Sequence, residues 1–205
     1  MSGRRESKKR ETRQRISDVA TRLFVARGFD AVTLDEIAAA AKVSKMTIFN
    51  YFARKEDLML DREDHLLLLP FREALRARVK GEAPIDAIRR HAKLLREQEH
   101  PFLRIDPRSL DWWRTVAASP SLKARLRALE DEAAEGLALE LGALKPDGLA
   151  RLLAGMIALT MRMAREEAVR VLERGGTANK ANGSLIALID CGLAAVQAIA
   201  GAKSG

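Results

Sequence analysis

The sequence has little of what β-rich, disulfide-rich or membrane-spanning proteins need. Aromatic residues make up only 4% of its 205 residues, and 13 glycines and 6 prolines are too few for the many turns of a sandwich or barrel. Its single cysteine, Cys191, excludes an internal disulfide framework and fits a reducing cytoplasm. No apolar run reaches the ~18 residues that span a bilayer. Leu, Ala, Arg and Glu dominate instead, and this composition predicts an all-α fold.

Signals for export, metal binding and catalysis are also missing. The first residues, MSGRRESKKRE, are charged with no apolar segment behind them, so we expect a soluble, cytoplasmic protein without membrane contact. The three histidines, His65, His91 and His100, lack the spacing of metal ligands. No phosphate-binding loop and no Ser-His-Asp-like grouping is found. The sequence therefore predicts no metal, no cofactor and no catalytic residue, which argues against an enzyme.

The most informative stretch is residues 33–55, TLDEIAAAAKVSKMTIFNYFARK. Thr33 and Glu36 predict a capping box at the start of a first short helix, whose apolar face repeats at helical spacing. Ser44 is a natural N-cap for a second short helix, with Ile48 as an inward residue. Two short helices joined by a tight turn are typical of a helix-turn-helix, whose second helix enters the major groove of DNA.

This segment resembles the N-terminal signature of the TetR family of transcriptional regulators, over about residues 10 to 60. The family usually has glycine where this chain has Lys42, so the resemblance predicts a left-handed lysine, at a cost of about 1 kcal/mol. It usually has tyrosine where this chain has Phe49. The family's motif and the outward positions of the second helix together predict nine residues that contact DNA: Thr33, Ser44, Lys45, Met46, Thr47, Phe49, Asn50, Tyr51 and Lys55.

Positive charge is concentrated at the N-terminal end of the chain. Residues 1–55 hold 13 Lys and Arg against 6 Asp and Glu, whereas the other 150 residues hold 23 against 22. Phosphate binding with counterion release requires this kind of excess. We interpret the run of Arg4, Arg5, Lys8, Lys9 and Arg10 as a basic arm that adds phosphate or minor-groove contacts. A merely solubilising tail is the alternative.

Turn signals predict the order of the helices. A first helix from about Lys9 to Arg27, ending at Gly28, completes a three-helix DNA-binding domain over residues 1–55. Residues 56–205 are predicted to form a second helical domain, which the resemblance assigns to ligand binding and dimerisation. The expected helices of this domain cover about 56–70, 71–80, 84–99, 107–118, 119–141, 146–174 and 181–202.

The last two expected helices carry wide apolar faces with many alanines and glycines. So much apolar surface needs to be covered on more than one side. Two core helices of a monomer are one explanation. We favour a homodimer interface of four helices, two from each subunit, because TetR relatives dimerise in this way and a palindromic operator requires two-fold symmetry.

Bulky, adaptable side chains are spread over several of the expected helices. The resemblance implies a pocket for a small hydrophobic or amphipathic effector, although such side chains at helical spacing are also common in ordinary cores. The candidate ligand-binding residues are His91, Arg104, Trp113, Met156, Thr160 and Met161.

The predicted function is that of a ligand-responsive, homodimeric transcriptional regulator of a double-stranded DNA operator, in this family most often a repressor. One alternative is a protein that organises DNA without sequence preference. Lys45, Thr47 and Asn50 argue against it, because the outward set includes side chains able to read base edges. Another alternative is a helical enzyme that acts on a hydrophobic small molecule and retains a vestigial DNA-binding module.

Overall fold

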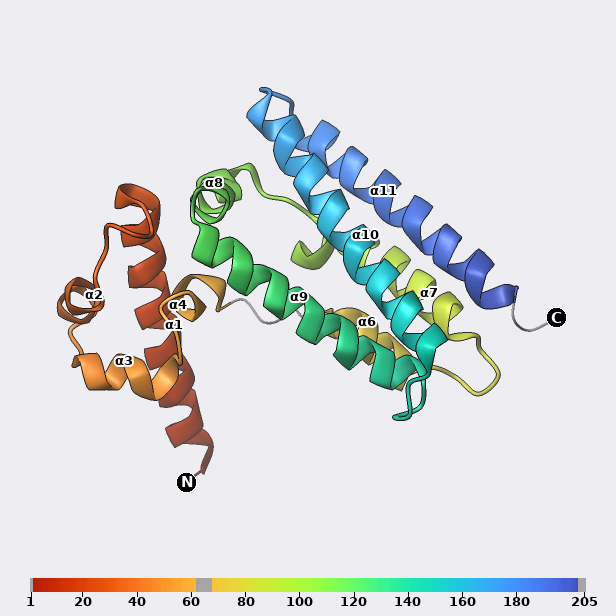
Figure 1. The fold of residues 1–205 in the computed structure, drawn as a ribbon, viewed down its shortest axis with the longest axis horizontal. Helices are drawn as coiled ribbons and strands as arrows, with labels where there is room; N and C mark the ends of the chain where they lie inside the picture. The colour runs from red at the N-terminus through yellow and green to blue at the C-terminus, as the bar shows by residue number, and fades with distance from the viewer. Residues whose placement is uncertain (1, 62–67, 203–205) are drawn as a thin grey trace. The chain divides into compact units, whose positions relative to one another are not determined.

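The computed structural model describes residues 2–61 and 68–202, and every regular element within these ranges is helical (Figure 1). The predicted all-α fold is therefore confirmed. The chain divides into two compact units, one made of Met1–Arg62 with Asp111–Leu126, the other of Glu63–Leu110 with Arg127–Gly205. The domain boundary predicted between residues 55 and 56 stays a prediction.

The first unit contains the predicted three-helix module and helices from two further parts of the chain. Its elements are α1 (Ser2–Arg27), α2 (Leu34–Ala40), α3 (Lys45–Tyr51), α4 (Asp57–Leu60), nearly all of α8 (Leu110–Ala118) and the first turns of α9 (Pro120–Leu141). The predicted start of the first helix at Lys9 is wrong, because α1 begins at Ser2. Lys, Arg and Glu are good helix formers, and Glu6 precedes Arg10 at the stabilising i,i+4 spacing.

The core of this unit forms on one face of α1. Ile16, Ala20 and Phe24 are fully buried there, at the spacing that brings side chains onto one side of a helix. Gly28 ends α1 with a φ of 87°, a left-handed conformation that glycine adopts without strain. The ring of Phe29 then packs against that of Phe24, with centroids 4.8 Å apart.

The single helix predicted from residue 56 to about residue 70 is wrong. Helix α4 ends at Leu60, and Asp61 leaves the helical conformation with φ −71° and ψ 54°. The next described helix, α6, begins at Leu69 after Leu68, whose φ is 52°. Pro70 lies in the first turn of α6, where its missing N–H has no helical partner to lose. His65, in the predicted far end of the helix, lies outside the described residues.

The second unit is a bundle of the remaining helices. It contains α6 (Leu69–Arg76), α7 (Pro84–Glu97), the short helices η1 (Pro101–Leu103) and η2 (Pro107–Ser109), the rest of α9, α10 (Gly148–Glu173) and α11 (Ala178–Gly201). The predicted end of one helix at Lys80 and the predicted start of another at Pro146 are each wrong by a few residues. Helix α6 ends at Arg76, and α10 starts after Asp147, whose carboxylate caps it.

Helices α10 and α11 run side by side along most of their length (Figure 1). At Gly192 the two helices approach so closely that an added Cβ would lie 2.3 Å from side-chain atoms of Thr160. Glycine is therefore required at this position of α11 for steric reasons, although its φ is ordinary. Gly183, on the same helix, has no atom within 4 Å of an added Cβ.

These two glycines give a matched test of the α10–α11 packing. Gly192→Ala should destabilise the protein by about 1–3 kcal/mol, because the new methyl group forces the helices apart. Gly183→Ala should stabilise it by about 0.5–1 kcal/mol, since alanine is the better helix former and meets no neighbour. Urea unfolding at one fixed protein concentration measures both changes. Equal effects of the two variants would mean that α10 and α11 do not touch at Gly192.

Candidate functional site

Side-chain caps hold the two short helices of the predicted helix-turn-helix. The backbone N–H of Thr33 donates to Oε2 of Glu36 at 2.8 Å, and the Thr33 hydroxyl accepts from the N–H of Glu36 at 3.3 Å, which confirms the capping box. Ser44 caps α3 by accepting from the N–H of Thr47 at 3.0 Å. Lys42, in the turn between the helices, has the predicted left-handed backbone, with φ 53°. Short-range interactions between residues close in the sequence therefore determine where the two helices of the helix-turn-helix begin and how the turn between them is formed.

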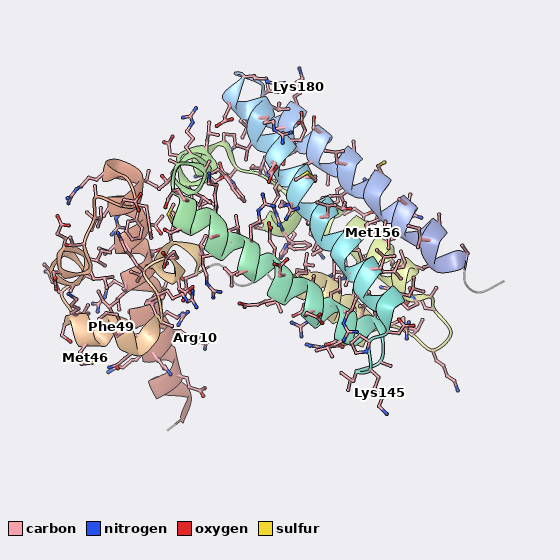
Figure 2. The ribbon with its side chains drawn as sticks, in the orientation of Figure 1. Arg10, Met46, Phe49, Lys145, Met156 and Lys180 are labelled. Carbon is pink, nitrogen blue, oxygen red and sulfur yellow. The ribbon has the colours of Figure 1, made fainter. Side chains whose placement is uncertain are left out.

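Helix α3 buries one side and presents the other to solvent. Ile48 is 1% exposed and anchors the inner side, whereas Met46 and Phe49 are 68% and 50% exposed (Figure 2). Lys45 and Asn50 are exposed as well. Large apolar side chains that are exposed to solvent on a short helix indicate a surface that contacts another molecule.

Several of the predicted DNA-contacting side chains already have a partner within the chain. The ammonium group of Lys45 pairs with the carboxylate of Asp35 at 2.9 Å, and both side chains are exposed. The hydroxyls of Ser44 and Thr47 lie 2.8 Å apart. Exposed pairs of this kind stabilise proteins by little, so Lys45 can exchange Asp35 for another partner at small cost.

Lys55 has a structural role that the sequence did not indicate. Its ammonium donates to the carbonyl oxygen of Phe29 at 2.7 Å and lies 4.3 Å from the centroid of the Phe29 ring. The Phe24 ring centroid is 5.5 Å from the same nitrogen. Lys55 thus ties the segment between α3 and α4 to the loop after α1, by a hydrogen bond and cation–π attraction. Its predicted contact with DNA stays a prediction.

Arg13 connects α1, α3 and the end of α4, and sequence reasoning missed it. Its Nε and Nη2 donate to the carboxylate of Asp61 at 2.7–3.0 Å, and its Nη1 donates to the carbonyl oxygen of Tyr51 at 2.5 Å. The guanidinium also lies over the ring of Phe52, 4.5 Å from its centroid. The partners are 38 and 48 residues away along the chain, so no local sequence pattern predicts these contacts.

Three further side chains hold α4 in the first unit. The hydroxyl of Ser17 donates to the carbonyl of Leu58 at 2.9 Å, and Nε1 of Trp112 donates to the carbonyl of Met59 at 3.3 Å. Arg125 binds the carboxylate of Asp57 at 2.7 Å. The carbonyls at the end of a helix have no partner within it, so these donors satisfy groups that would otherwise be buried alone.

The six predicted ligand-binding residues do not share one environment. Met161 is buried in the bundle with 1% exposure, Thr160 lies against Gly192, and Met156 is half-buried on α10. Arg104 is exposed and pairs with Glu99 at 2.8 Å.

The other two candidates belong to different units. His91 is half-buried on α7, and burial is the main cause that lowers its pKa below the ordinary 6.5. Trp113 belongs to the first unit, where its ring meets that of Trp112 edge to face at 4.7 Å. Their predicted role in ligand binding stays a prediction.

Two pockets of the second unit lie elsewhere, and none of the six predicted residues lines either of them. One, of about 450 Å³, lies between α7 and α11. The other, of about 530 Å³, lies where α7 begins and where α9 and α11 end, and includes Asp86, Lys145 and Asp147. Within residues 2–61 and 68–202, no group of three or more His, Cys, Asp or Glu could hold a metal ion.

A buried polar cluster joins α9 to α10 inside the second unit. Arg162 donates to the carboxylate of Glu130 at 3.2 Å, and burial raises the pKa of Glu130. Burial also lowers the pKa of Arg165 to about 10, and its guanidinium lies 5.5 Å from the centroid of the Phe102 ring. A paired carboxylate at this depth fixes how the two helices align, because any shift would leave it uncompensated.

Helices α10 and α11 each carry large exposed apolar side chains at a spacing that places them on one face of the helix. Leu152 and Leu159 on α10 are 53% and 46% exposed, and Leu188 and Ile199 on α11 are 39% and 38% exposed. Cys191, also on α11, is exposed as well. Helix α11 is long and apolar enough to cross a membrane by length and composition, yet only 22% of its most apolar segment is buried in the chain. These exposed apolar faces are therefore expected to pack against another surface.

The capping box makes one prediction about acid stability. The hydrogen bond from the Thr33 backbone, followed by the Arg27 and Thr33 side chains, lowers the pKa of Glu36 from 4.5 to about 2. A lowered pKa in the folded state means that the stabilisation is complete above pH 4.5 and is lost as pH falls toward 2. An NMR titration should find this value in the folded protein.

Two variants separate the causes of the low pKa. Thr33→Ala keeps the backbone N–H, so the pKa of Glu36 should stay well below 4.5. Arg27→Ala, which removes the ion pair of 2.8 Å, should raise it further than Thr33→Ala does. A Glu36 that titrates near 4.5 in the unmodified protein would contradict the capping box.

Comparison with known proteins adds to this geometry. The sequence profile of the bacterial regulatory proteins of the tetR family matches residues 16–61. The HTH-type transcriptional regulator TcmR of Streptomyces glaucescens is 36% identical over 86 residues, which cover 42% of this chain and 38% of TcmR. The uncharacterized HTH-type transcriptional regulator TtgW of Pseudomonas putida is 34% identical over 91 residues, which cover 43% of this chain and 68% of TtgW.

The matches to the first three curated relatives span between about a third and a half of the relatives' own length. A solved structure assigned to the TetR-family transcriptional regulators, from Mesorhizobium loti, aligns with a TM-score of 0.52. The alignment covers 92% of this chain and 96% of the other at 19% sequence identity. So low an identity supports a common fold and nothing finer.

Proposed function

This chain belongs to the TetR family of bacterial transcriptional regulators, and we propose that it is a repressor that binds a palindromic DNA operator as a homodimer. A small hydrophobic or amphipathic ligand releases it from the operator. The observation that carries the proposal is the exposed face of α3, presented by two capped helices at the basic end of the chain.

Sequence-specific binding requires side chains that read base edges. Lys45 can donate to guanine O6 and N7, Asn50 can pair with adenine, and Met46 offers an apolar surface to a thymine methyl group. All three are exposed on α3. Thr33 and Lys55, which are also predicted to contact DNA, would bind phosphates and so position this helix.

The homodimer is supported by the exposed apolar face of α10 and α11. A second copy of the same face would cover it, since a two-fold interface brings one surface against itself. Such a cover explains why α11 is so apolar, and it favours a soluble protein of the cytoplasm over a membrane-bound one. Two copies would also supply the two recognition helices that adjacent half-sites require.

The proposed base contact of Lys45 can be tested on a panel of operator variants. Lys45→Ala should flatten base preference at one or two symmetric positions, because each such contact contributes about 1–3 kcal/mol of discrimination. Selection from random DNA, followed by footprinting, first defines the operator. A footprint without any preferred sequence would overturn the proposed repressor in favour of a protein that merely coats DNA.

Lys55→Ala serves as the comparison for Lys45→Ala. It should weaken binding to all operator variants alike. It should also reduce the slope of log K against log salt concentration by about 1, as the loss of one phosphate contact does. A melting curve of each variant is needed beside the binding data, since Lys55 also holds the loop at Phe29. If Lys45→Ala behaves in the same uniform way, Lys45 contacts only the DNA backbone.

The dimer makes a separate prediction. Ala198→Arg should place an unpaired charge in the apolar interface, at a cost of about 3–5 kcal/mol. Sedimentation should then report monomers, and operator affinity should collapse. Ala77→Arg, at an exposed position beyond α6, adds the same charge outside the interface and should leave the dimer intact.

The native thiol gives an independent measurement of the same interface. Cys191 is exposed in the single chain, so a dimer through α10 and α11 should slow its reaction with a maleimide. The Ala198→Arg protein should react faster than the unmodified one. A fully dimeric Ala198→Arg protein with an unprotected thiol would place the interface elsewhere.

A further inference from the structure

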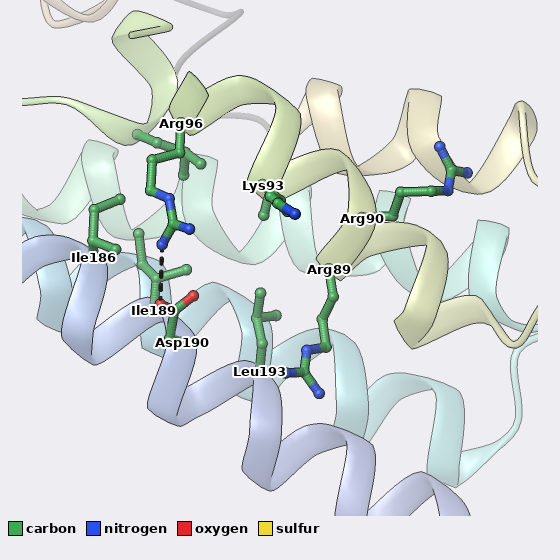
Figure 3. Close-up of a pocket in the computed structure, with 10 residues that line it drawn as sticks. Arg89, Arg90, Lys93, Arg96, Ile186, Ile189, Asp190 and Leu193 are labelled. Carbon is green, nitrogen blue, oxygen red and sulfur yellow. Dashed lines mark hydrogen bonds and ion pairs between the residues drawn. The ribbon is translucent and has the colours of Figure 1, made fainter. Parts of the chain in front are cut away.

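The groove of about 450 Å³ between α7 and α11 combines an apolar floor with a basic rim (Figure 3). Ala92 and Leu103 form part of the floor from one side, and Ile189 and Leu193 of α11 complete it. All four are less than 8% exposed. The small side chain of Ala92 leaves room above the floor, and the half-buried Ile186 borders one end.

The rim of the groove is strongly basic on its α7 side. Arg89, Arg90, Lys93 and Arg96 line it, against the single carboxylate of Asp190 on α11. Arg89, Lys93 and Arg96 follow one another at i, i+4 and i+7, so they share one edge of α7 over about 10 Å. Two helical turns thus offer a row of cations along an apolar surface.

Only part of this charge is neutralised by the chain itself. Arg90 points toward Glu82, to which it donates two hydrogen bonds of 2.9 and 3.1 Å. Arg96 reaches across the groove to Asp190 at 3.4 Å, with both side chains about half exposed. Such a long, solvated pair is weak.

The other two cations have no acid partner among the residues that the structure describes. Arg89 donates to the neutral amide of Gln197. Lys93 forms no hydrogen bond or ion pair with any described residue. The middle of the rim therefore carries positive charge that a ligand, rather than the protein, is free to neutralise.

We infer that this groove binds a small amphipathic carboxylate, with its apolar body on the floor and its carboxylate on Lys93 and Arg96. The volume lies within the range of small-molecule sites, which are mostly apolar with a few placed polar groups. The planar guanidinium of Arg96 can hold a carboxylate through two parallel hydrogen bonds once it leaves Asp190. A neutral ligand would use the floor and leave the rim unpaired.

The site deepens the proposed function by naming the ligand class, and its regulatory part rests on that function. The groove is separate from the six residues predicted from the sequence, none of which lines it. Octanoate binding to the groove can be measured without DNA, so the two proposals can fail separately.

Calorimetry on the full-length protein tests the site with three probes that share one alkyl chain. Octanoate should bind saturably at one molecule per chain. Octanol should bind at least about tenfold more weakly, because it cannot form the charge-assisted contacts. Octyltrimethylammonium should not bind, since the rim repels it. Absence of saturable octanoate binding, or equal affinities for octanoate and octanol, would overturn the inference.

Charge reversal at the centre of the rim isolates the role of Lys93. Lys93→Glu should weaken octanoate about tenfold or more and leave octanol unchanged. Lys80→Glu is the matched control, because Lys80 is exposed outside the groove, and it should change neither affinity. Ile186→Gln should weaken both probes by reducing the apolar surface. If Lys93→Glu binds octanoate as the unmodified protein does, the groove is not the site.

Octanoate affinity measured with and without saturating operator separates this inference from the proposed function. Reciprocal weakening of octanoate and operator would support both. If octanoate binds through Lys93 but its affinity is unchanged by operator, the groove stands and ligand-controlled release fails. If the operator binds but octanoate does not, the repressor proposal stands and the groove fails.

Discussion

One guanidinium group decides where α3 lies in the first unit. Arg13 joins the carbonyl of Tyr51, at the last residue of α3, to the carboxylate of Asp61, the residue after α4. A planar fork bound on two sides fixes direction as well as distance, which a lysine cannot do. The Phe52 ring beneath it removes the remaining freedom. Since α3 has only seven residues, it depends on this contact more than a longer helix would.

The same dependence extends to α4, which is shorter still. Four residues cannot form a stable helix alone, and its carbonyls at Leu58 and Met59 are satisfied by Ser17 and Trp112. With Asp57 bound to Arg125 and Asp61 bound to Arg13, α4 is fixed at both ends. Its geometry is therefore imposed by neighbours that come from α1, α8 and α9.

This pattern explains what the sequence could predict. The capping box at Thr33, the left-handed Lys42 and the stop at Gly28 are local, so motif and spacing were sufficient. The break at Asp61 depends on Arg13, 48 residues earlier. The prediction of one uninterrupted helix from residue 56 to about residue 70 therefore did not include this break. The spacing of the basic row on α7 can be read from the sequence. Most of the apolar floor beside it comes from η1 and α11, which only the fold brings next to α7.

The discontinuity of the first unit limits how this DNA-binding module could be exchanged between proteins. Residues 111–126 are separated from residues 1–62 by a stretch of about fifty that belongs to the other unit. A graft ending after α4 would carry Asp57 without Arg125 and the Met59 carbonyl without Trp112. A transplanted module must therefore consist of two segments. A chimaera that contains only the helix-turn-helix would lack the contacts that support it.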